Sequence, residues 1–328
     1  MSRIFSGIQP SGELHIGNYL GAVKNWVALQ HTHPGALFCV VDYHAITGVY
    51  DPALLRTRRW EMATSLLAAG LEPARCALFM QSDVPEHTEL SWIFTTLVPL
   101  GDLERQTQFK DKSGKMESIP AGLLMYPVLQ AADILLYRAD AVPVGEDQIQ
   151  HLELARHCPK VEQPFGEGFF PEPKPLLTPT RRIMGLDGGS KMSKSLGNTV
   201  GLLETDEEIW AKLRPAMTDP QRVRRTDPGR PEVCNIFHLH KAFNAPETVD
   251  HVAVQCSTAG WGCIDCKKVL HEGMIRELTP IRVRAQQLAD DPTRVSDTLA
   301  DGARTARALA QSTIAETRTR MGLDSLSA

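Results

Sequence analysis

A short segment rich in lysine and serine, Lys191-Met192-Ser193-Lys194-Ser195, follows the pair Gly188-Gly189. Glycines are typical of turns, so the sequence predicts an exposed loop with two ammonium groups and two hydroxyls that can serve no core. Such groups can stabilise a departing pyrophosphate, where negative charge accumulates when a nucleophile attacks the α-phosphate of ATP. A solvated loop is the plainer alternative. We predict catalytic roles for Lys191, Ser193, Lys194 and Ser195.

A second candidate for phosphate binding lies near the N-terminus, at His15-Ile16-Gly17-Asn18, preceded by Gln9-Pro10-Ser11-Gly12. The β-type run 3–8 comes before it and the amphipathic stretch 16–30 follows, so the motif falls on a strand-to-helix turn. A helix N-terminus offers free N–H groups and a positive dipole end, which suit a phosphate. Gly17 would let a flat base approach the backbone. Taken alone, these four residues could equally be an ordinary helix-capping turn.

Strand-like and helical patterns alternate around these motifs in the first half of the chain. The predicted strands are 3–8, 36–46, 77–81 and 141–144. Asp51-Pro52 predicts the start of a helix that Gly70 ends, and a further helix is predicted over 123–136. This rhythm predicts an α/β fold with a doubly wound parallel sheet, whose ligands bind beyond the carboxyl ends of the strands.

The pattern changes in the second half. Residues 163–180 are rich in proline and glycine and predict a long surface loop. Residues 205–208 form a capping box that opens a helix, and the chain is almost wholly helical from Asp265 onward. We expect a catalytic domain over 1–186 and a mostly helical region over 187–328, whose terminal helix, about 290–328, can pack back on the first domain.

Composition excludes several classes of protein. The 328 residues are 42% hydrophobic, enough for a sizeable core, and the net charge of −4 argues against a polycation that coats nucleic acid. Any nucleic-acid site must therefore be a local patch. No signal peptide or membrane span is expected, which predicts a cytoplasmic protein with no membrane partner.

Together, the HIGN and KMSKS segments resemble the two signature motifs of the class I aminoacyl-tRNA synthetases, the first of which is usually written HIGH. Four further segments resemble the bacterial tryptophanyl-tRNA synthetases: 4–12, 41–47, 131–137 and 142–148. The resemblance covers the catalytic half and is looser in the helical region. It implies a homodimer that forms tryptophanyl-adenylate from L-tryptophan and ATP, bound with Mg²⁺, and passes tryptophan to tRNA(Trp).

The resemblance also implies the residues that bind ATP. They are Gln9, Ser11, His15, Gly17, Asn18, Gly145, Asp147, Gln148, Ile183, Lys191, Met192, Ser193, Lys194 and Ser195.

Indole presents one N–H donor and a large apolar face, so its pocket needs one buried acceptor among hydrophobic walls. Asp133, inside an apolar helical run, suits that acceptor and matches the family's indole-recognising aspartate, although it could instead cap or pair internally. Gln130 stands where some members have methionine and would add a polar group beside the indole. The resemblance implies the other pocket residues: Phe5, Val41, His44, Tyr126, Ile134, Val142, Val144 and Gln148.

Four of the seven cysteines gather in the helical region: Cys234, Cys256, Cys263 and Cys266. Four thiolates, two of them in a Cys-x-x-Cys pair, suit zinc or an iron–sulfur cluster, with chance clustering as the alternative. Some tryptophanyl-tRNA synthetases carry a [4Fe-4S] cluster on a similar pattern, so the resemblance favours the cluster over zinc. The remaining cysteines are predicted core thiols: Cys39, Cys76 and Cys158.

Basic residues in the helical region form a candidate patch for the tRNA backbone, with a solvated charged face as an equal alternative. They are Arg222, Arg224, Arg225, Arg230, Lys267 and Lys268.

Rival functions are a tyrosyl-tRNA synthetase, a small-molecule nucleotidyltransferase of the same superfamily, and a non-catalytic paralogue that binds RNA or nucleotide. The paired motifs argue against the last rival, because a binder needs no lysines aimed at a leaving group.

Overall fold

A parallel β-sheet forms the centre of the computed structural model, which describes residues 2–114, 116–145, 149–157, 165–177 and 183–325. Strands β1 (Phe5–Ile8), β2 (Ala36–Val40) and β3 (Cys76–Met80) pair in that order. Strand β4 (Ala141–Val144) pairs with β5 (Lys174–Leu177), and a parallel bridge between Ile4 and Ala141 brings β4 beside β1. The strand order is therefore β5-β4-β1-β2-β3, which confirms the predicted α/β fold.

Alternate side chains of the strands enter two separate hydrophobic cores, one on each face of the sheet. One core joins the sheet to helices α2 (Lys24–Thr32), α4 (Pro52–Ala69) and α13 (Cys263–Asp290), through strand residues Ile4, Phe38, Val40, Leu78 and Met80. The other joins it to helices α5 (Glu86–Thr95) and α8 (Ala121–Leu135), through Phe5, Leu37, Cys39, Ala77 and Phe79. Helices thus cover both faces, as a doubly wound sheet requires.

Local signals set the ends of α4 as the sequence predicts. The Asp51 carboxylate accepts hydrogen bonds from the backbone N–H groups of Ala53, at 2.8 Å, and Leu54, at 3.1 Å. Pro52 occupies the first helical position, where its missing N–H removes no helical hydrogen bond. Gly70 ends the helix in the left-handed conformation, with φ of 119°, which a residue with a Cβ rarely adopts.

Strand β2 is shorter than predicted. It ends at Val40, and residues 42–45 form the short helix α3 (Asp42–Ala45). The Asp42 carboxylate accepts hydrogen bonds from the Ser82 N–H, at 2.9 Å, and hydroxyl, at 2.6 Å, and pairs with Arg59 at 2.7 Å. These contacts turn the chain at the carboxyl end of the strand, and the residues concerned are too far apart in sequence for a local pattern to reveal them.

Part of the predicted loop over 163–180 is also a strand, because β5 occupies residues 174–177. Pro175 argues against a central strand, since proline cannot donate a ladder hydrogen bond. The prediction failed because β5 is paired along β4 alone within the described chain, and an edge strand tolerates proline.

Short helical segments complete the catalytic half. They are α1 (Ile16–Asn18), the π-helix η1 (Tyr19–Val23), the 3₁₀-helix η2 (Gln81–Asp83), α6 (Leu100–Glu104), α7 (Thr107–Ser113) and α9 (Ile149–His157). No helix in the described ranges combines the length and apolarity needed to cross a membrane.

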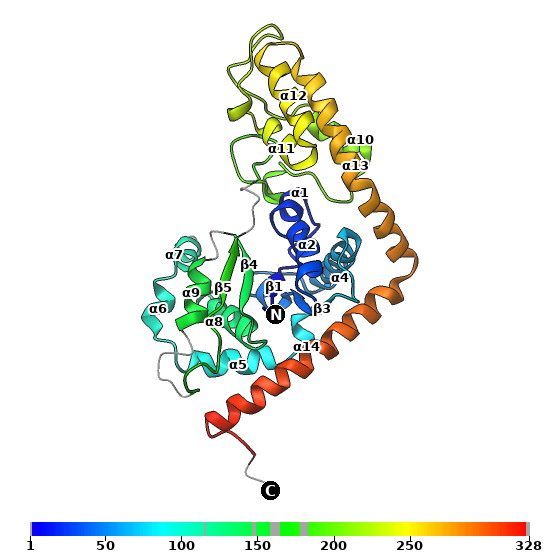
Figure 1. Cartoon of the computed structure of the whole chain (residues 1–328). Helices are drawn as coiled ribbons and strands as arrows, with labels where there is room; N and C mark the ends of the chain where they lie inside the picture. Colours follow the sequence, from blue (N-terminus) through cyan, green and yellow to red (C-terminus); the bar gives the residue numbers. More distant parts are fainter. Residues whose placement is uncertain (1, 115, 146–148, 158–164, 178–182, 326–328) are drawn as a thin grey trace.

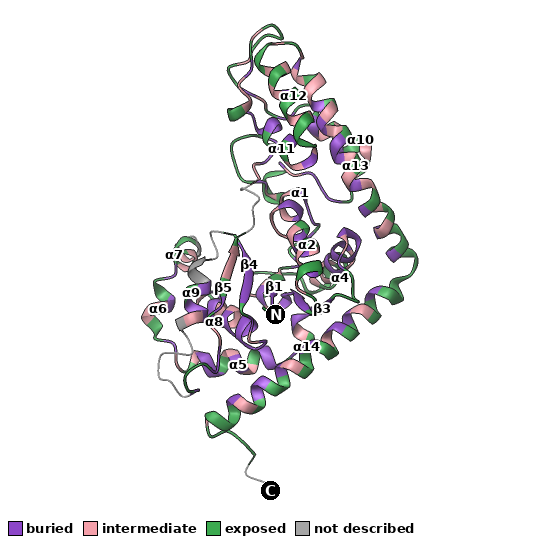
Figure 2. Cartoon of the chain, in the orientation of Figure 1, coloured by how far each residue is buried: buried purple, intermediate pink, exposed green. Residues whose placement is uncertain are grey.

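The C-terminal part is mostly helical, as predicted. After the 3₁₀-helix η5 (Lys194–Leu196), α10 (Asp206–Leu213) opens with a Thr205–Glu208 capping box. The elements that follow are the 3₁₀-helix η6 (Pro231–Val233), α11 (Asn235–Phe243), α12 (Pro246–Ser257), α13 and α14 (Pro292–Arg320). Helices α10 to α12 project with the first half of α13 beyond the sheet, and α14 runs back past it (Figure 1). Buried positions recur along one side of α14 (Figure 2).

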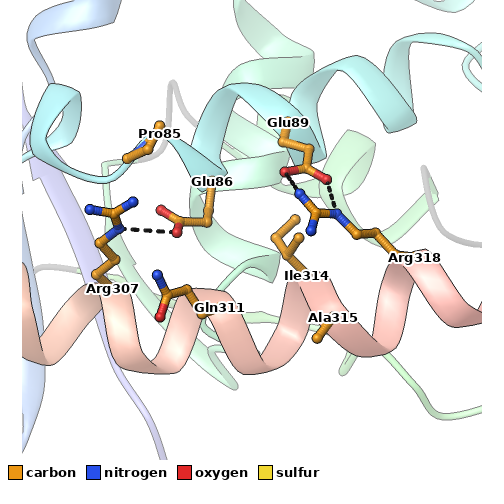
Figure 3. A pocket seen from close by; sticks show the side chains of 8 residues that line it. All are labelled: Pro85, Glu86, Glu89, Arg307, Gln311, Ile314, Ala315 and Arg318. Carbon is orange, nitrogen blue, oxygen red and sulfur yellow. Dashed lines mark hydrogen bonds and ion pairs between the residues drawn. The ribbon is translucent and has the colours of Figure 1, made fainter. Parts of the chain in front are cut away.

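Helix α14 packs directly against β3. A Cβ added at Gly302 would overlap the backbone of Leu78, so the helix can approach this strand only because Gly302 has no side chain. Further along, Arg307 pairs with Glu86 at 3.2 Å and Arg318 pairs with Glu89 at 2.6 Å (Figure 3). Helix α14 therefore covers the outer strand and holds α5 in place.

Candidate active site

The HIGN segment caps the first helix with its own histidine. The Nδ1 atom of His15 accepts hydrogen bonds from the backbone N–H groups of Gly17, at 3.1 Å, and Asn18, at 3.3 Å. Burial, followed by the charges of Lys194 and Lys191, lowers the pKa of His15 to about 4. The imidazole is therefore neutral at pH 7, as an Nδ1 acceptor must be.

The KMSKS loop lies against the HIGN turn. The Ile16 N–H donates to the Val200 carbonyl at 2.9 Å, and the Leu202 N–H donates to the Leu14 carbonyl at 2.8 Å, which fixes the chain just after the loop to the turn. A Cβ added at Gly12 would lie 3.1 Å from the Nζ atom of Lys194. The two motifs, about 180 residues apart in sequence, thus form one site, as a joint role in phosphate binding requires.

Asn198 holds the loop in shape, and sequence reasoning missed it. Its side-chain oxygen accepts from the Ser193 N–H at 2.8 Å, and its amide group donates to Asp187 Oδ2 at 2.9 Å. Asp187 Oδ1 accepts in turn from the Gly189 N–H at 3.3 Å. A Cβ at Gly185 would overlap the Asn198 amide. Only the polar character of a residue just beyond KMSKS could have drawn attention to it.

The reactive groups of the loop face outward. Lys191, Lys194 and Ser195 are exposed, whereas Met192 is buried and anchors the loop. The Ser193 and Ser195 hydroxyls are 3.0 Å apart. Partial burial lowers the pKa of the Lys194 ammonium; Glu13 opposes this effect. The loop therefore presents cations and hydroxyls over the strand-to-helix turn.

Some of the other residues predicted to bind ATP lie at strand ends or beside the KMSKS loop. Gln9 and Ser11 are exposed after β1, and Gly145 is exposed at the end of β4. The Ile183 carbonyl accepts from the Met192 N–H at 3.2 Å, so Ile183 supports the loop. Asp147 and Gln148 lie outside the described residues.

Asp133 is buried in α8 and 1% exposed, at the centre of a polar network. Its Oδ2 atom lies 2.7 Å from His44 Nε2, and its Oδ1 atom lies 2.7 Å from both Gln81 Nε2 and His87 Nδ1. Burial by itself would raise the pKa of Asp133, but the two histidines outweigh it and hold that pKa well below its usual range. The carboxylate is therefore ionised at neutral pH and can accept a hydrogen bond.

The predicted apolar walls belong to the same core as the α8 helix that carries Asp133. They are the buried side chains of Phe5, Val41, Ile134, Val142 and Val144. The Tyr126 ring lies edge-on to His44, with centroids 6.4 Å apart, and its hydroxyl donates to Gln108 at 3.0 Å. Gln130 is partly buried one turn before Asp133. The structure thus places the apolar residues in the core that includes α8, and His44 in direct contact with Asp133.

Sequence reasoning missed three residues of this network: Gln81, His87 and Tyr137. The Tyr137 hydroxyl lies 2.7 Å from His87 Nε2, and Gln81 Oε1 accepts from the Tyr43 N–H at 3.0 Å. Tyr137 belongs to segment 131–137, which resembles the bacterial tryptophanyl-tRNA synthetases, but nothing in the sequence indicated its contact with His87. His87 follows Asp83-Val84-Pro85-Glu86, which reads as an ordinary helix start.

The four gathered cysteines lie at or beside the ends of three helices. Cys234 precedes α11, Cys256 lies in the last turn of α12, and Cys263 and Cys266 lie in the first turn of α13. Burial, followed by the charges of the other three cysteines, raises the pKa of Cys266 to about 12. Among the described residues, no group of three or more histidine, cysteine or acidic side chains stands ready to hold a metal ion.

The predicted basic patch is smaller than expected, and its assignment of Lys267 is wrong. Lys267 is 4% exposed, and its ammonium donates to the carbonyls of Arg214, at 2.8 Å, and Ala216, at 2.6 Å, beyond the end of α10. Arg222 donates to the Trp261 carbonyl, and Arg230 pairs with Asp219. The exposed members are Arg224, Arg225 and Lys268.

Two cavities lie outside the predicted site residues. One, of about 470 Å³, lies between α5 and α14 and is lined by Pro85, Glu86, Glu89, Arg307, Gln311, Ile314, Ala315 and Arg318 (Figure 3). The other, of about 730 Å³, lies between α4, α10 and α13, and Glu13, Trp60, Glu204 and Arg282 are among its lining residues. Glu13 and Glu61 line the second cavity and also connect it with the KMSKS loop, because the charge of each raises the pKa of Lys194.

Comparison with known proteins agrees with this geometry. Residues 1–279 match the family described as "tRNA synthetases class I (W and Y)". The chain is 54% identical to a tryptophan–tRNA ligase of Deinococcus radiodurans, over 98% of this chain and 99% of that protein. It is 41% identical to one from Thermotoga maritima, with the same coverage. The crystal structure of a tryptophanyl-tRNA synthetase from Campylobacter jejuni, complexed with ADP and tryptophan, is similar with a TM-score of 0.87 and 35% identity, covering 98% of this chain and 100% of that one.

Proposed function

Because the chain belongs to the class I tRNA synthetases for tryptophan and tyrosine, we propose that it performs its chemistry between the HIGN turn and the KMSKS loop. The enzyme is a ligase: it activates L-tryptophan with ATP and then transfers tryptophan to tRNA(Trp). The observation that carries the assignment of the site is the position of Lys194, whose Nζ atom lies beside the Gly12 turn at the end of β1.

In the first step, the tryptophan carboxylate attacks the α-phosphorus of ATP. A bond forms between carboxylate oxygen and phosphorus, and the bond from phosphorus to the bridging oxygen of the pyrophosphate breaks. The lysines and serines of KMSKS compensate the charge that gathers on the leaving pyrophosphate. The HIGN turn, at the positive end of the helix dipole, receives the nucleotide beside Gly17, with Mg²⁺ accompanying the phosphates.

In the second step, a hydroxyl of the terminal tRNA nucleotide attacks the adenylate carbonyl and AMP leaves. Arg224, Arg225 and Lys268 are the exposed cations that we assign to the tRNA backbone. Reversing the charge of Lys268 should weaken tRNA binding at low salt. Unchanged affinity would remove it from the interface.

Tryptophan is selected by Asp133, which accepts the indole N–H inside apolar walls. A substrate that lacks this N–H would leave one acceptor site of the buried carboxylate unfilled, which is costly, so such substrates should be rejected. Asp133→Ala should therefore reduce kcat/KM for tryptophan in pyrophosphate exchange. An unchanged kcat/KM would remove Asp133 from the pocket. Gln148, Tyr126 and His44 complete the polar side of this pocket in our proposal.

The four cysteines hold a [4Fe-4S] cluster in our proposal, with zinc as the alternative. Two observations support this proposal: the four cysteines lie at or beside the ends of α11, α12 and α13, and the raised pKa values of Cys256 and Cys266 are of the kind that fall when a cation binds thiolate. Cys234, Cys256, Cys263 and Cys266 would bind the metal, which would tie α11, α12 and α13 together and has no part in the adenylate step.

Three further features are proposals on the same footing. The chain divides into a catalytic domain over 1–186 and a mostly helical region after it, and the enzyme acts in the cytoplasm. It works as a homodimer, which the exposed apolar side chains of Trp92, at 69%, and Leu100, at 60%, support on α5 and α6. Sedimentation analysis of the parent and a Trp92→Glu variant tests the dimer, which the charged variant should weaken.

A further inference from the structure

We propose that His87 is a positioning residue for tryptophan selection: together with Gln81 it fills one oxygen of Asp133, so that the indole N–H can be accepted only by the other. This inference rests on the proposed role of Asp133 as the indole acceptor. Neither His87 nor Gln81 needs to touch the substrate.

The Asp133 carboxylate has limited capacity for hydrogen bonds. Its Oδ1 atom accepts from Gln81 Nε2 and from His87 Nδ1, both at 2.7 Å. Since a carboxylate oxygen offers about two acceptor sites, Oδ1 is fully used. Oδ2 lies 2.7 Å from His44 Nε2, which is its one hydrogen-bond partner in the described part of the chain. One acceptor site is therefore left, and it is on Oδ2.

The ring of His87 is oriented from its far side. Because an ionised carboxylate is an acceptor, His87 Nδ1 must carry a proton and donate to Asp133. The Tyr137 hydroxyl lies 2.7 Å from the Nε2 atom on the opposite side of the ring and is hydrogen-bonded to it. Burial raises the pKa of Tyr137 well above its usual value, so the hydroxyl keeps its proton. A chain of hydrogen bonds thus links Tyr137 through His87 to Asp133.

Surrounding contacts prevent these donors from moving. Gln81 cannot turn its amide over, because its Oε1 atom accepts from the Tyr43 N–H at 3.0 Å. His87 is fully buried and packs between the rings of Phe79 and Tyr137. The helix that carries His87 is held by α14 through the neighbouring ion pairs of Glu86 and Glu89 (Figure 3). Rotation of the carboxylate would break the bonds at Oδ1, so the direction of Oδ2 is fixed.

His44 and His87 therefore act differently on the same carboxylate. His44 follows β2 and lies beside the Tyr126 ring, and it shares Oδ2 with the expected indole N–H. His87, which lies on α5, is hydrogen-bonded to Oδ1 and affects the substrate only through Asp133. Loss of His87 should therefore affect recognition of the indole N–H rather than the chemical step.

The test compares tryptophan with its benzothiophene analogue, in which sulfur replaces the indole N–H. We would measure kcat and KM for both in amino-acid-dependent pyrophosphate exchange, with the parent, His87→Leu, His87→Asn, Tyr137→Phe and Asp133→Ala. The preference for tryptophan is the ratio of the two kcat/KM values. His87→Leu should lower this preference about tenfold or more, mainly by raising KM for tryptophan. His87→Asn should restore much of it, because its amide can donate to Oδ1.

The variants separate the possible failures. A preference unchanged in His87→Leu, with equal losses for both substrates, overturns the positioning role. If His87→Leu is inactive with both substrates, Tyr137→Phe decides: the positioning role predicts a lowered preference for tryptophan in this variant, and an unchanged preference overturns the role. If only Asp133→Ala lowers the preference, Asp133 remains the acceptor and the role of His87 fails. If Asp133→Ala leaves the preference unchanged, the indole assignment fails and the inference falls with it.

Discussion

The ammonium group of Lys194 lies beside the Gly12 turn, where an added Cβ would come within 3.1 Å of its Nζ atom. Gly12 itself has φ of 120°, so this position excludes most side chains on conformational grounds as well. The contact places a cation of the KMSKS loop at the carboxyl end of β1, near the N-terminus of the first helix. Negative charge that develops on a phosphate there would lie near both the lysine and the positive end of the helix dipole.

Replacement of Lys194 by alanine should therefore slow adenylate formation. Loss of one preorganised donor typically lowers such a rate by about 10²- to 10³-fold. Tryptophan binding should change little, because Asp133 belongs to a separate network. Single-turnover formation of the adenylate measures the rate, and equilibrium dialysis measures binding. Lys268→Ala, which removes an exposed lysine far along the chain, is the control. Equal rates for Lys194→Ala and the parent would contradict the assignment.

Replacement of Gly302 by alanine should destabilise the protein, although alanine is a better helix former than glycine. The new Cβ would overlap the Leu78 backbone, which cannot move aside as a flexible side chain would. Overpacking of this kind costs about 1–3 kcal/mol. Urea denaturation would measure the change in the free energy of unfolding.

Gly21→Ala is the matched control for that substitution. Gly21 also lies in a helical segment, but nothing stands within 4 Å of an added Cβ there. This variant should gain about 0.5–1 kcal/mol in the free energy of unfolding. A stabilised Gly302→Ala variant would show that α14 does not pack against β3 as described.

Stability should fall as the solution is acidified from about pH 6.5 to about pH 4. The folded protein holds the pKa of His15 at about 4, mainly through burial, against 6.5 for the free side chain. Within this window the unfolded chain binds more protons, so acid favours unfolding and the stabilisation is complete only above pH 6.5. Allowing for screening by solvent, His15 should contribute about 1–2 kcal/mol to this loss.

The variant His15→Asn isolates that contribution. Asparagine can still cap the helix but does not titrate, so the free energy of unfolding should depend less on pH between 6.5 and 4. His240, whose pKa burial also lowers to about 4, remains in both proteins and cancels in the comparison. The same dependence in the variant and the parent would mean that folding does not lower the pKa of His15.

Iron and sulfide should co-purify with the protein, bound by the four gathered cysteines, when purification is carried out without oxygen. About four of each per chain, with a visible absorption band, would establish the cluster. Cys266→Ser should lose this iron, whereas Cys76→Ser should keep it, because Cys76 lies in the sheet core. Zinc near one per chain would make the site a structural zinc site. No metal at all would return the cysteines to ordinary thiols.

Features that depend on neighbours in sequence could be predicted. The ends of α4 follow from Asp51, Pro52 and Gly70, and the start of α10 follows from its capping box. The proximity of the HIGN and KMSKS segments was also expected, because each is a recognisable sequence motif and both were predicted to bind the phosphates of one ATP molecule.

Features that depend on distant contacts could not be predicted. A lysine is normally expected at the surface. Lys267 is buried because its ammonium group donates to backbone carbonyls beyond the end of α10. His87 and Asp133 are 46 residues apart, and no local pattern links them. Strand β5 is favoured by pairing with β4, which outweighs the proline in it. In each case the deciding interaction joins residues whose proximity only the folded chain creates.

The most direct test of the site and its substrate is pyrophosphate exchange measured with tryptophan and, separately, with tyrosine. The parent protein should exchange label between pyrophosphate and ATP when tryptophan is present, and Lys194→Ala should lose most of that exchange. Tyrosine should support little exchange. Exchange that depends on tyrosine instead, or none with either amino acid from folded protein, would contradict the function assigned to this site.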